Sequence, residues 1–192
     1  METLTDIFSH FCGQKSGFVA GGAVLPVCQR CLGLYVGAAV TGVWMAVCGL
    51  WRRGLPSWSV FLLNEVMLLA AMLGGAHVWG SAPAAKLACG LWTGHVAALW
   101  LIGGAGHLWR LSRPAPPGQL PWRLRDKLQA LAAAPILAAL AWLIPHGMFL
   151  GWGFWAVLIV AGAVLLAAAA TAAIVALATY LATRLRRRAA AA

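Results

Sequence analysis

Long apolar stretches recur along the chain, and each is bounded by charged residues or prolines. A transmembrane helix needs about 20 mainly apolar residues to cross a bilayer. Five stretches meet this need, and they predict membrane-spanning helices over residues 32–51, 57–79, 87–109, 128–144 and 154–181. The long polar segment Leu111–Lys127 contains four prolines and predicts a loop between the third and fourth spans. The predicted fold class is therefore all-α, a polytopic transmembrane helical bundle of about five spans.

Composition excludes several other classes of protein. Of the 192 residues, 62% are hydrophobic and 9% are charged, whereas soluble domains carry about 25% charged residues. An ordinary soluble enzyme, a disordered tail and a secreted disulfide scaffold are thus excluded. The net charge of +10 does not indicate nucleic-acid binding, because such binding needs basic residues along one solvated face. We expect the lipid bilayer and other membrane proteins as partners, and no nucleic acid.

The basic residues are divided unevenly between the two sides of the predicted bundle. With five spans, eleven Lys and Arg fall on one side and three on the other. Because basic residues collect on the cytoplasmic side of membrane proteins, we expect the N-terminus outside and the C-terminus in the cytoplasm. The chain then divides into an extracytoplasmic interfacial helix and cysteine motif (1–31), three spans (32–109), a basic cytoplasmic loop (110–127), and two spans with a basic tail (128–192).

Three cysteines precede the first predicted span. Cys28 and Cys31 lie one helical turn apart at the start of a helix, where the helix N-terminus and Arg30 attract negative charge. Cys12 adds a third thiol and His10 an imidazole, so these side chains could form a tetrahedral zinc site. The alternatives are a dithiol–disulfide relay, in which Cys12 resolves the Cys28–Cys31 pair, and structural or inert cysteines.

The segment from Cys28 to Gly37 reads Cys-x-Arg-Cys-x-Gly-x-Tyr-x-Gly. It resembles the signature of a prokaryotic family of membrane proteins, the domain of unknown function 2085, over about residues 8–105. Cys12 corresponds to the upstream cysteine of that family, and Gly13 stands where the family commonly has a histidine. The resemblance implies a small polytopic protein integral to a prokaryotic cytoplasmic (inner) membrane, and it implies no activity.

Two pairs of glycines four residues apart predict close helix packing, since small residues let membrane helices approach. Gly33 and Gly37 lie in the first predicted span, and Gly90 and Gly94 lie in the third. If the two faces pair, Cys89 should lie near the Cys28–Cys31 pair. The alternative is that each face packs on another helix.

Glu65 is the only acidic residue inside a predicted span. An ionisable group in the membrane needs a partner, and His95 lies at a compatible depth, so we expect these two side chains to pair. The pair would serve as an interhelical hydrogen bond or as a proton relay. His77 and His146 should reach the outer side, where they are candidate cofactor ligands.

The sequence contains no phosphate-binding glycine loop, no HExxH motif and no paired carboxylates, which argues against a hydrolase and a nucleotide-driven enzyme. Whether the protein is an enzyme stays open, and a non-enzymatic role is favoured. The leading interpretation is an integral membrane subunit or scaffold of a larger complex, with a structural or metal-binding cysteine cluster on its outer face. One alternative is a membrane dithiol oxidoreductase that couples Cys28 and Cys31 to quinone. Another is a carrier of a small hydrophobic ligand or metal, centred on Glu65. Zinc is the expected metal, and haem, chlorophyll and quinone are less favoured.

Overall fold

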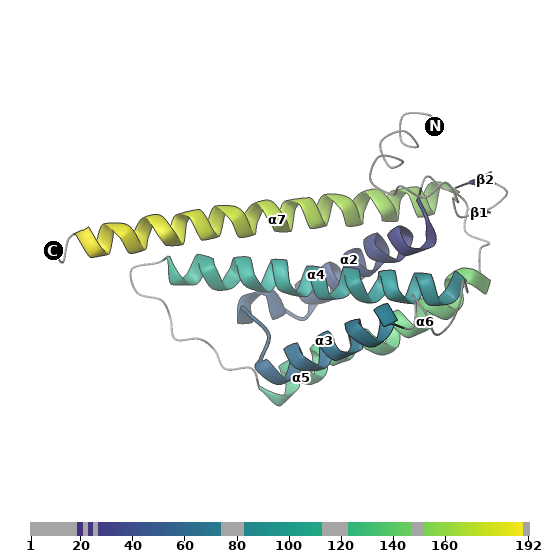
Figure 1. Ribbon diagram of the computed structural model, residues 1–192, viewed down its shortest axis with the longest axis horizontal. Helices are drawn as coiled ribbons and strands as arrows, with labels where there is room; N and C mark the ends of the chain where they lie inside the picture. The colour runs from purple at the N-terminus through teal and green to yellow at the C-terminus, as the bar shows by residue number, and fades with distance from the viewer. Residues whose placement is uncertain are drawn as a thin grey trace.

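The computed structural model describes residues 19–20, 23–24, 27–73, 83–112, 123–146 and 152–189. Within these ranges the chain forms an elongated bundle whose helices run back and forth along one long axis (Figure 1). The elements are β1 (Val19–Ala20), β2 (Ala23–Val24), α2 (Gln29–Val47), the 3-10 helix η1 (Leu50–Arg53), α3 (Trp58–Leu73), α4 (Pro83–Leu111), α5 (Leu124–Leu131), α6 (Ala133–His146) and α7 (Trp152–Ala189). The two short strands pair antiparallel. All other elements of the described ranges are helical, so the predicted all-α class is confirmed.

With α5 and α6 counted together, four helical segments of the described ranges are long and apolar enough to cross a membrane: Gln29–Val47, Ala84–Leu111, Leu124–Ile144 and Gly153–Ala189. The predicted second span, 57–79, is described only as far as Leu73, and there it forms a shorter apolar helix of 16 residues. The structure is thus a bundle of apolar helices of the kind that the hydropathy pattern predicted. Residues 1–18, which include the predicted interfacial helix, lie outside the described ranges.

The predicted loop between the third and fourth spans is too long at its C-terminal end. Helix α5 begins at Leu124, because Asp126 caps it: the backbone N–H of Arg123 donates to Asp126 Oδ2 at 2.8 Å. The predicted span over 128–144 is correspondingly two helices, divided at Ala132. Pro135 follows this break by one turn, and a proline cannot donate the backbone hydrogen bond that would continue the helix through it.

The first span is also displaced from its predicted bounds of 32–51. Helix α2 ends at Val47, and Gly49 follows in the left-handed region with φ of 66°. Glycine adopts this conformation readily and commonly ends helices. The chain then turns through η1, whose backbone lies against α4: a Cβ on Gly106 would meet the carbonyl oxygen of Trp51 at 2.8 Å.

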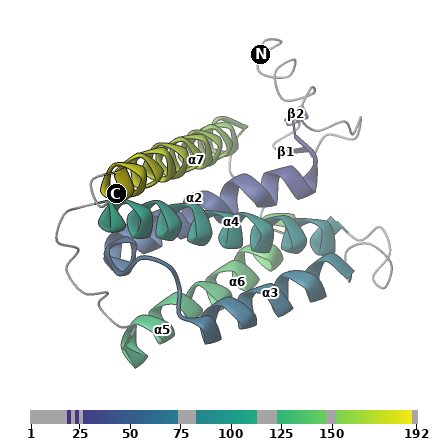
Figure 2. The ribbon, with the colours of Figure 1, turned by 60° about the vertical axis from the view of Figure 1, so that its left-hand side comes forward.

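The bundle is arranged around the pair formed by α2 and α4. Helix α7 covers one side of this pair, and α3 with α5 and α6 covers the other (Figure 2). One apolar cluster gathers near the start of α2, and it consists of Val27, Leu32, Val36, Leu87, Leu91, Leu137, Ile144, Trp155 and Ile159. A second gathers towards the other end, and it consists of Met45, Leu50, Val60, Leu99 and Ala130.

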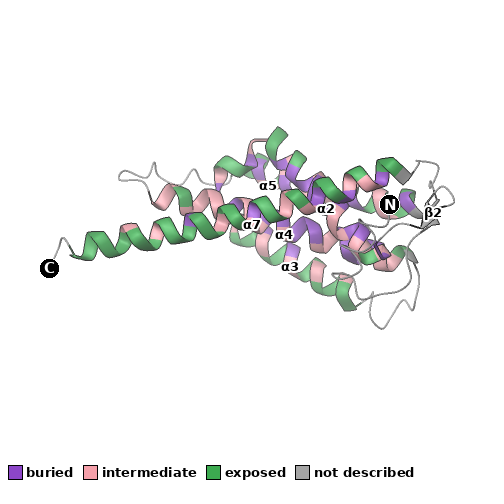
Figure 3. Ribbon diagram, turned by 90° about the horizontal axis from the view of Figure 1, so that it is seen from above, coloured by how far each residue is buried: buried purple, intermediate pink, exposed green. Residues whose placement is uncertain are grey.

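The outer helices present apolar side chains on their outward faces. Helix α3 buries only Val60 and Asn64, while Val66 is 62% exposed. Helix α7 is exposed along much of its length, for example at Val164, which is 61% exposed (Figure 3). Acyl chains of a bilayer solvate such surfaces as well as another helix does. The exposure pattern therefore fits a membrane protein.

Candidate functional site

The two glycine faces interlock across α2 and α4. A Cβ on Gly33 would collide with the backbone of Leu87 and Leu91, and a Cβ on Gly94 with the backbone of Leu34. Gly90 faces Arg30 in the same way, so contacts advance together along both helices, which run in the same direction. The predicted pairing of the two faces is confirmed.

A buried polar chain crosses three helices directly beside this interface. Thr41 Oγ1 on α2 lies 2.9 Å from His95 Nδ1 on α4, and His95 Nε2 lies 3.1 Å from Asn64 Oδ1 on α3. All three residues are at most 2% exposed. We call them the Thr41–His95–Asn64 chain.

The hydrogen bonds around Asn64 assign the roles in this chain. Asn64 Nδ2 donates to the carbonyl oxygen of Val60 at 2.8 Å, so Oδ1 is its acceptor. His95 Nε2–H therefore donates to Asn64, and Nδ1 accepts from the Thr41 hydroxyl. Trp92 Nε1 also donates to the Asn64 backbone oxygen at 3.1 Å. Each polar group of the chain is thus used in holding α2, α3 and α4 together.

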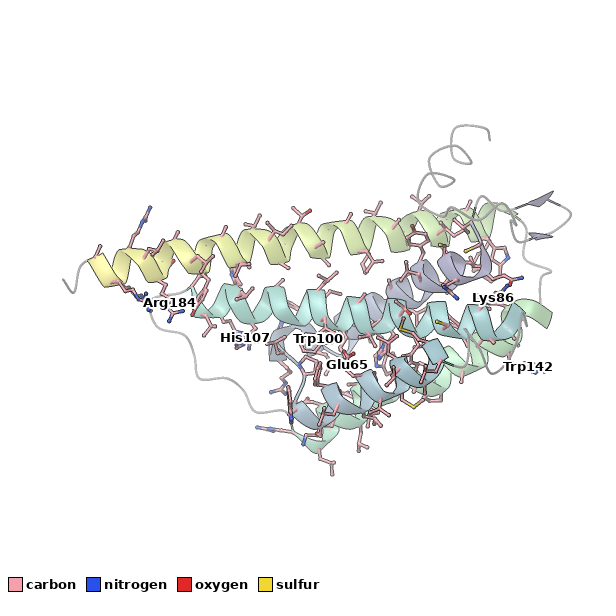
Figure 4. All side chains as sticks on the ribbon, viewed as in Figure 1. Glu65, Lys86, Trp100, His107, Trp142 and Arg184 are labelled. Carbon is pink, nitrogen blue, oxygen red and sulfur yellow. The ribbon has the colours of Figure 1, made fainter. Side chains whose placement is uncertain are left out.

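The predicted pairing of Glu65 with His95 is wrong. Glu65 Oε1 accepts a hydrogen bond from Trp100 Nε1 at 3.1 Å (Figure 4). His95 instead bonds Asn64, the neighbour of Glu65 in sequence. Consecutive residues of a helix point about 100° apart, so only one of the two side chains can face the centre of the bundle. The centre is occupied by the neutral amide, and the carboxyl lies half-buried at the flank of α3.

The Trp100 ring that binds the carboxyl of Glu65 belongs to a row of packed aromatic rings. Phe61 packs edge-on against Trp100 with ring centroids 4.7 Å apart, and Trp58 stacks on Phe61 at 4.9 Å. We call Trp58, Phe61, Glu65 and Trp100 the Glu65 patch. Its residues come from α3 and α4, which the Glu65–Trp100 hydrogen bond joins.

The Cys28–Cys31 motif lies where the sequence predicted, at the beginning of a helix. Cys28 is the N-cap residue of α2 and is buried, and Cys31 packs against the apolar cluster at this end of the bundle. Cys89 precedes Gly90, which packs against the backbone of Arg30, and its proximity to the Cys28–Cys31 pair stays a prediction. No disulfide joins two of the cysteines within the described ranges.

The remaining predicted ligands cannot be placed. His10, Cys12 and His77 lie outside the described residues, as does the side chain of His146. Among the residues that the structure does describe, no three His, Cys, Asp or Glu side chains come together as a metal site. The zinc site and the haem or chlorophyll ligands therefore stay predictions.

An apolar cavity of about 520 Å³ lies between α3, α4 and α6. Its lining includes Cys89, Trp92 and Met67, together with Leu91 and Leu137. The last two residues also belong to the cluster against which Cys31 packs. Glu65 does not line this cavity, which gives no support to a carrier centred on that residue.

The sequence analysis did not predict an ion pair that the described residues contain. Arg53 Nε on η1 lies 3.5 Å from Asp126 Oδ1, and Asp126 is 5% exposed. An acidic residue three positions after a helix start is a recognisable capping signal, so the role of Asp126 could have been predicted. The role of Thr41 had no such signal, because only the packing of α2 on α4 brings it to His95.

These observations define a polytopic α-helical membrane protein whose few buried polar groups pair between helices. Residues 12–100 match the family model described as "Predicted membrane protein (DUF2085)". The segment that carries α2, α3 and most of α4 therefore matches the family that the signature around Cys28 predicted, and α5 to α7 lie outside the match. No curated protein and no solved structure matches the chain.

Proposed function

We propose that the protein is a non-catalytic integral membrane subunit, and that the Glu65 patch docks a transmembrane helix of a partner protein. The observation that carries this proposal is the position of Glu65. It is an ionisable side chain in an apolar helix, yet it lies at the outer flank of that helix rather than in the centre of the bundle.

A carboxyl group in this position needs more than one hydrogen bond. An acidic residue at the centre of a membrane helix costs about 2.5–3.5 kcal/mol on insertion scales, and such residues are paired. Trp100 donates to Oε1, while no donor to Oε2 is found within the described residues. The side chain lies between the exposed Leu62 and Leu69, one turn away on either side. A partner helix that offers a hydrogen-bond donor at this depth would satisfy Oε2 and cover the two leucines.

The interior of the bundle favours a structural role. The Thr41–His95–Asn64 chain uses its donors and acceptors within the protein, so it holds helices together and leaves no group poised to act on a substrate. Glycine packing adds a second fixed contact along the same two helices. Such a rigid pair suits a scaffold.

The docking proposal is tested by the size of the complex after gentle solubilisation, measured by native mass spectrometry. We expect the protein in a fixed stoichiometry with a second membrane protein. Glu65→Ala and Val66→Trp should release that partner, whereas Val164→Trp should retain it. The two valines are a matched pair, since they are 62% and 61% exposed on different helices. A wild-type protein that runs alone, or a complex that survives both α3 substitutions, would refute the proposal.

The cysteine motif is assigned a structural or metal-binding role within this proposal. Cys28 and Cys31 at the start of α2 would bind zinc together with Cys12 and His10, which makes a complete set of four ligands. Elemental analysis of the purified protein should then give one zinc per chain, and Cys31→Ser should remove it. Zinc-free protein with unchanged stability in Cys31→Ser would contradict this role.

A second candidate is a membrane dithiol oxidoreductase, favoured by the apolar cavity whose lining residues Leu91 and Leu137 belong to the cluster that Cys31 packs against. In that reaction the two thiols lose two electrons and two protons and form a disulfide, while a quinone takes up both and becomes a quinol. The reduced protein should then convert a short-tailed ubiquinone to quinol, and Cys31→Ser should abolish the conversion. Cys48→Ser, at the far end of α2, is the control. Equal rates in the two variants would exclude this function.

We also propose a prokaryotic cytoplasmic membrane, with the C-terminus inside. This orientation is supported by the basic residues in the last turns of α4 and α7. Arg184 lies towards that end of the bundle, and Lys86, which is predicted to lie outside, is at the opposite end (Figure 4). A green fluorescent protein fused after Ala192 should fluoresce. An active alkaline phosphatase fusion at the same place would reverse the orientation.

A further inference from the structure

A second cavity, of about 770 Å³, lies at the end of the bundle where η1 and α4 meet α7. It is lined by Trp51, Arg52, Ile102, Ala105, Gly106, Trp109, Arg110, Leu165, Ala168, Ala169, Ala172 and Ala176. We call it the α4–α7 groove. Ala168, Ala172 and Ala176 follow one another by a helical turn each, so the groove extends along α7 for at least two turns.

Two arginines give one end of this apolar groove a positive charge. Arg110 Nη1 donates to the carbonyl oxygen of Arg52 at 2.6 Å, and Arg110 Nε to that of Gly106 at 3.1 Å. The Arg52 guanidinium lies 5.0 Å from the centre of the Trp51 ring. These contacts orient both guanidinium groups but neutralise neither charge.

No carboxylate in the described part of the chain compensates these charges. Asp126, on α5, forms its ion pair with Arg53. Arg110 Nη2 is buried and has no hydrogen-bond partner among the described residues. The groove therefore combines apolar walls with two uncompensated cations at its end.

Trp51 and Trp109 indicate the depth of the groove in the membrane. They are 45% and 49% exposed and lie next to the two arginines in sequence. Tryptophan collects at the level of lipid headgroups. The arginines are thus at phosphate level, and the alanine-lined part of the groove is at acyl-chain level.

We propose that the α4–α7 groove binds one anionic phospholipid. The headgroup phosphate lies at Arg52 and Arg110, and one acyl chain occupies the space beside Ala168, Ala172 and Ala176. A free phosphate would use only the charged end, whereas a lipid uses both the cations and the apolar walls. Each basic residue near the membrane surface strengthens the binding of an anionic lipid about fivefold.

The proposal is tested by native mass spectrometry of the protein released from nanodiscs that hold phosphatidylglycerol and phosphatidylcholine with identical acyl chains. We expect one retained phosphatidylglycerol per chain, which 10 mM inorganic phosphate does not displace. Arg52→Gln should weaken the retention of phosphatidylglycerol about fivefold. This substitution keeps the backbone carbonyl of residue 52, which accepts the hydrogen bond from Arg110. Ala172→Leu should also weaken retention, because the larger side chain fills the groove without changing the charge.

Two variants at residues that do not line the groove serve as controls. Arg184→Gln matches Arg52→Gln, because it removes one positive charge elsewhere on α7. Ala178→Leu matches Ala172→Leu, because it makes the same change of size at an exposed position. Both should retain the lipid as the wild type does. Equal retention of the two lipids, displacement by free phosphate, or equal losses in Arg52→Gln and Arg184→Gln would overturn the proposal. Unchanged retention in Ala172→Leu would overturn the acyl-chain part of the site.

Discussion

Replacing Gly94 with alanine should force α2 and α4 apart. The added Cβ would collide with the backbone of Leu34, and it would lie 2.8 Å from the backbone nitrogen of Ala38. Carbon–oxygen contacts between helices settle at about 3.3–3.6 Å, so the two backbones must separate by on the order of 1 Å. The neighbouring contacts on the same interface are backbone atoms as well, and backbone cannot rotate out of the way as a side chain can.

The size of the effect follows from a comparison of two alanine variants on α4. Overpacking of a tight interface costs about 1–3 kcal/mol. Alanine is also intrinsically favoured over glycine in a helix by about 1 kcal/mol, and Gly104→Ala measures that gain alone. A Cβ on Gly104 would meet only Leu55 Cδ2, at 3.9 Å. The free energy of unfolding should therefore be about 1–3 kcal/mol lower for Gly94→Ala than for Gly104→Ala.

Unfolding in mixed micelles of dodecyl sulfate and dodecyl maltoside, followed by far-ultraviolet circular dichroism, measures this difference. The Thr41–His95 bond lies next to Gly94, so it should lengthen in the same variant, and the His95 ring resonances should shift. Equal unfolding free energies for the two alanine variants would refute the close packing of α2 on α4.

Three further predictions concern the buried polar residues and the cysteine motif. Thr41→Val removes the donor to His95 Nδ1 and should lower the unfolding free energy by about 0.6–1.7 kcal/mol, the range for polar contacts between membrane helices; an unchanged value would mean that the bond is not formed. Asp126→Ala removes both the cap of α5 and the pair with Arg53, and should cost about 1 kcal/mol, whereas Asp126→Asn keeps an acceptor for the cap and should cost less; a larger loss in the asparagine variant would contradict the capping role. Removal of zinc by a chelator should lower the thermal stability of the wild type but not that of Cys31→Ser, and identical shifts in both would separate the metal from this motif.

The sequence predicted the helices and their closest contact, because both depend on local patterns. Apolar runs set the helices, and glycines four residues apart marked the faces of α2 and α4 that meet. Local patterns could not predict the partner of Glu65. They give the depth of a residue in the membrane but not the direction in which its side chain points around the helix axis. Asn64 and Glu65 share nearly the same depth, and the rotation of α3 alone decides that Asn64 reaches His95.

The helix ends were predicted less well for a similar reason. The break between α5 and α6, one turn before Pro135, lies within a continuous apolar run, so hydropathy cannot detect it. The polar residues around Asp126 predict a loop, whereas the cap that Asp126 forms starts helix α5. Its ion pair with Arg53 joins residues far apart in sequence, and only the folded bundle brings them together.

Photo-crosslinking from position 66 in native membranes tests the central claim most directly, because Val66 is exposed on α3 next to Glu65. A crosslinking residue in place of Val66 should give one discrete protein adduct, the same protein that co-purifies with the chain, and Glu65→Ala should remove that adduct. A crosslinking residue in place of Val164 should give lipid adducts only. Lipid adducts alone at position 66, or a protein adduct that persists in Glu65→Ala, would contradict docking at the Glu65 patch.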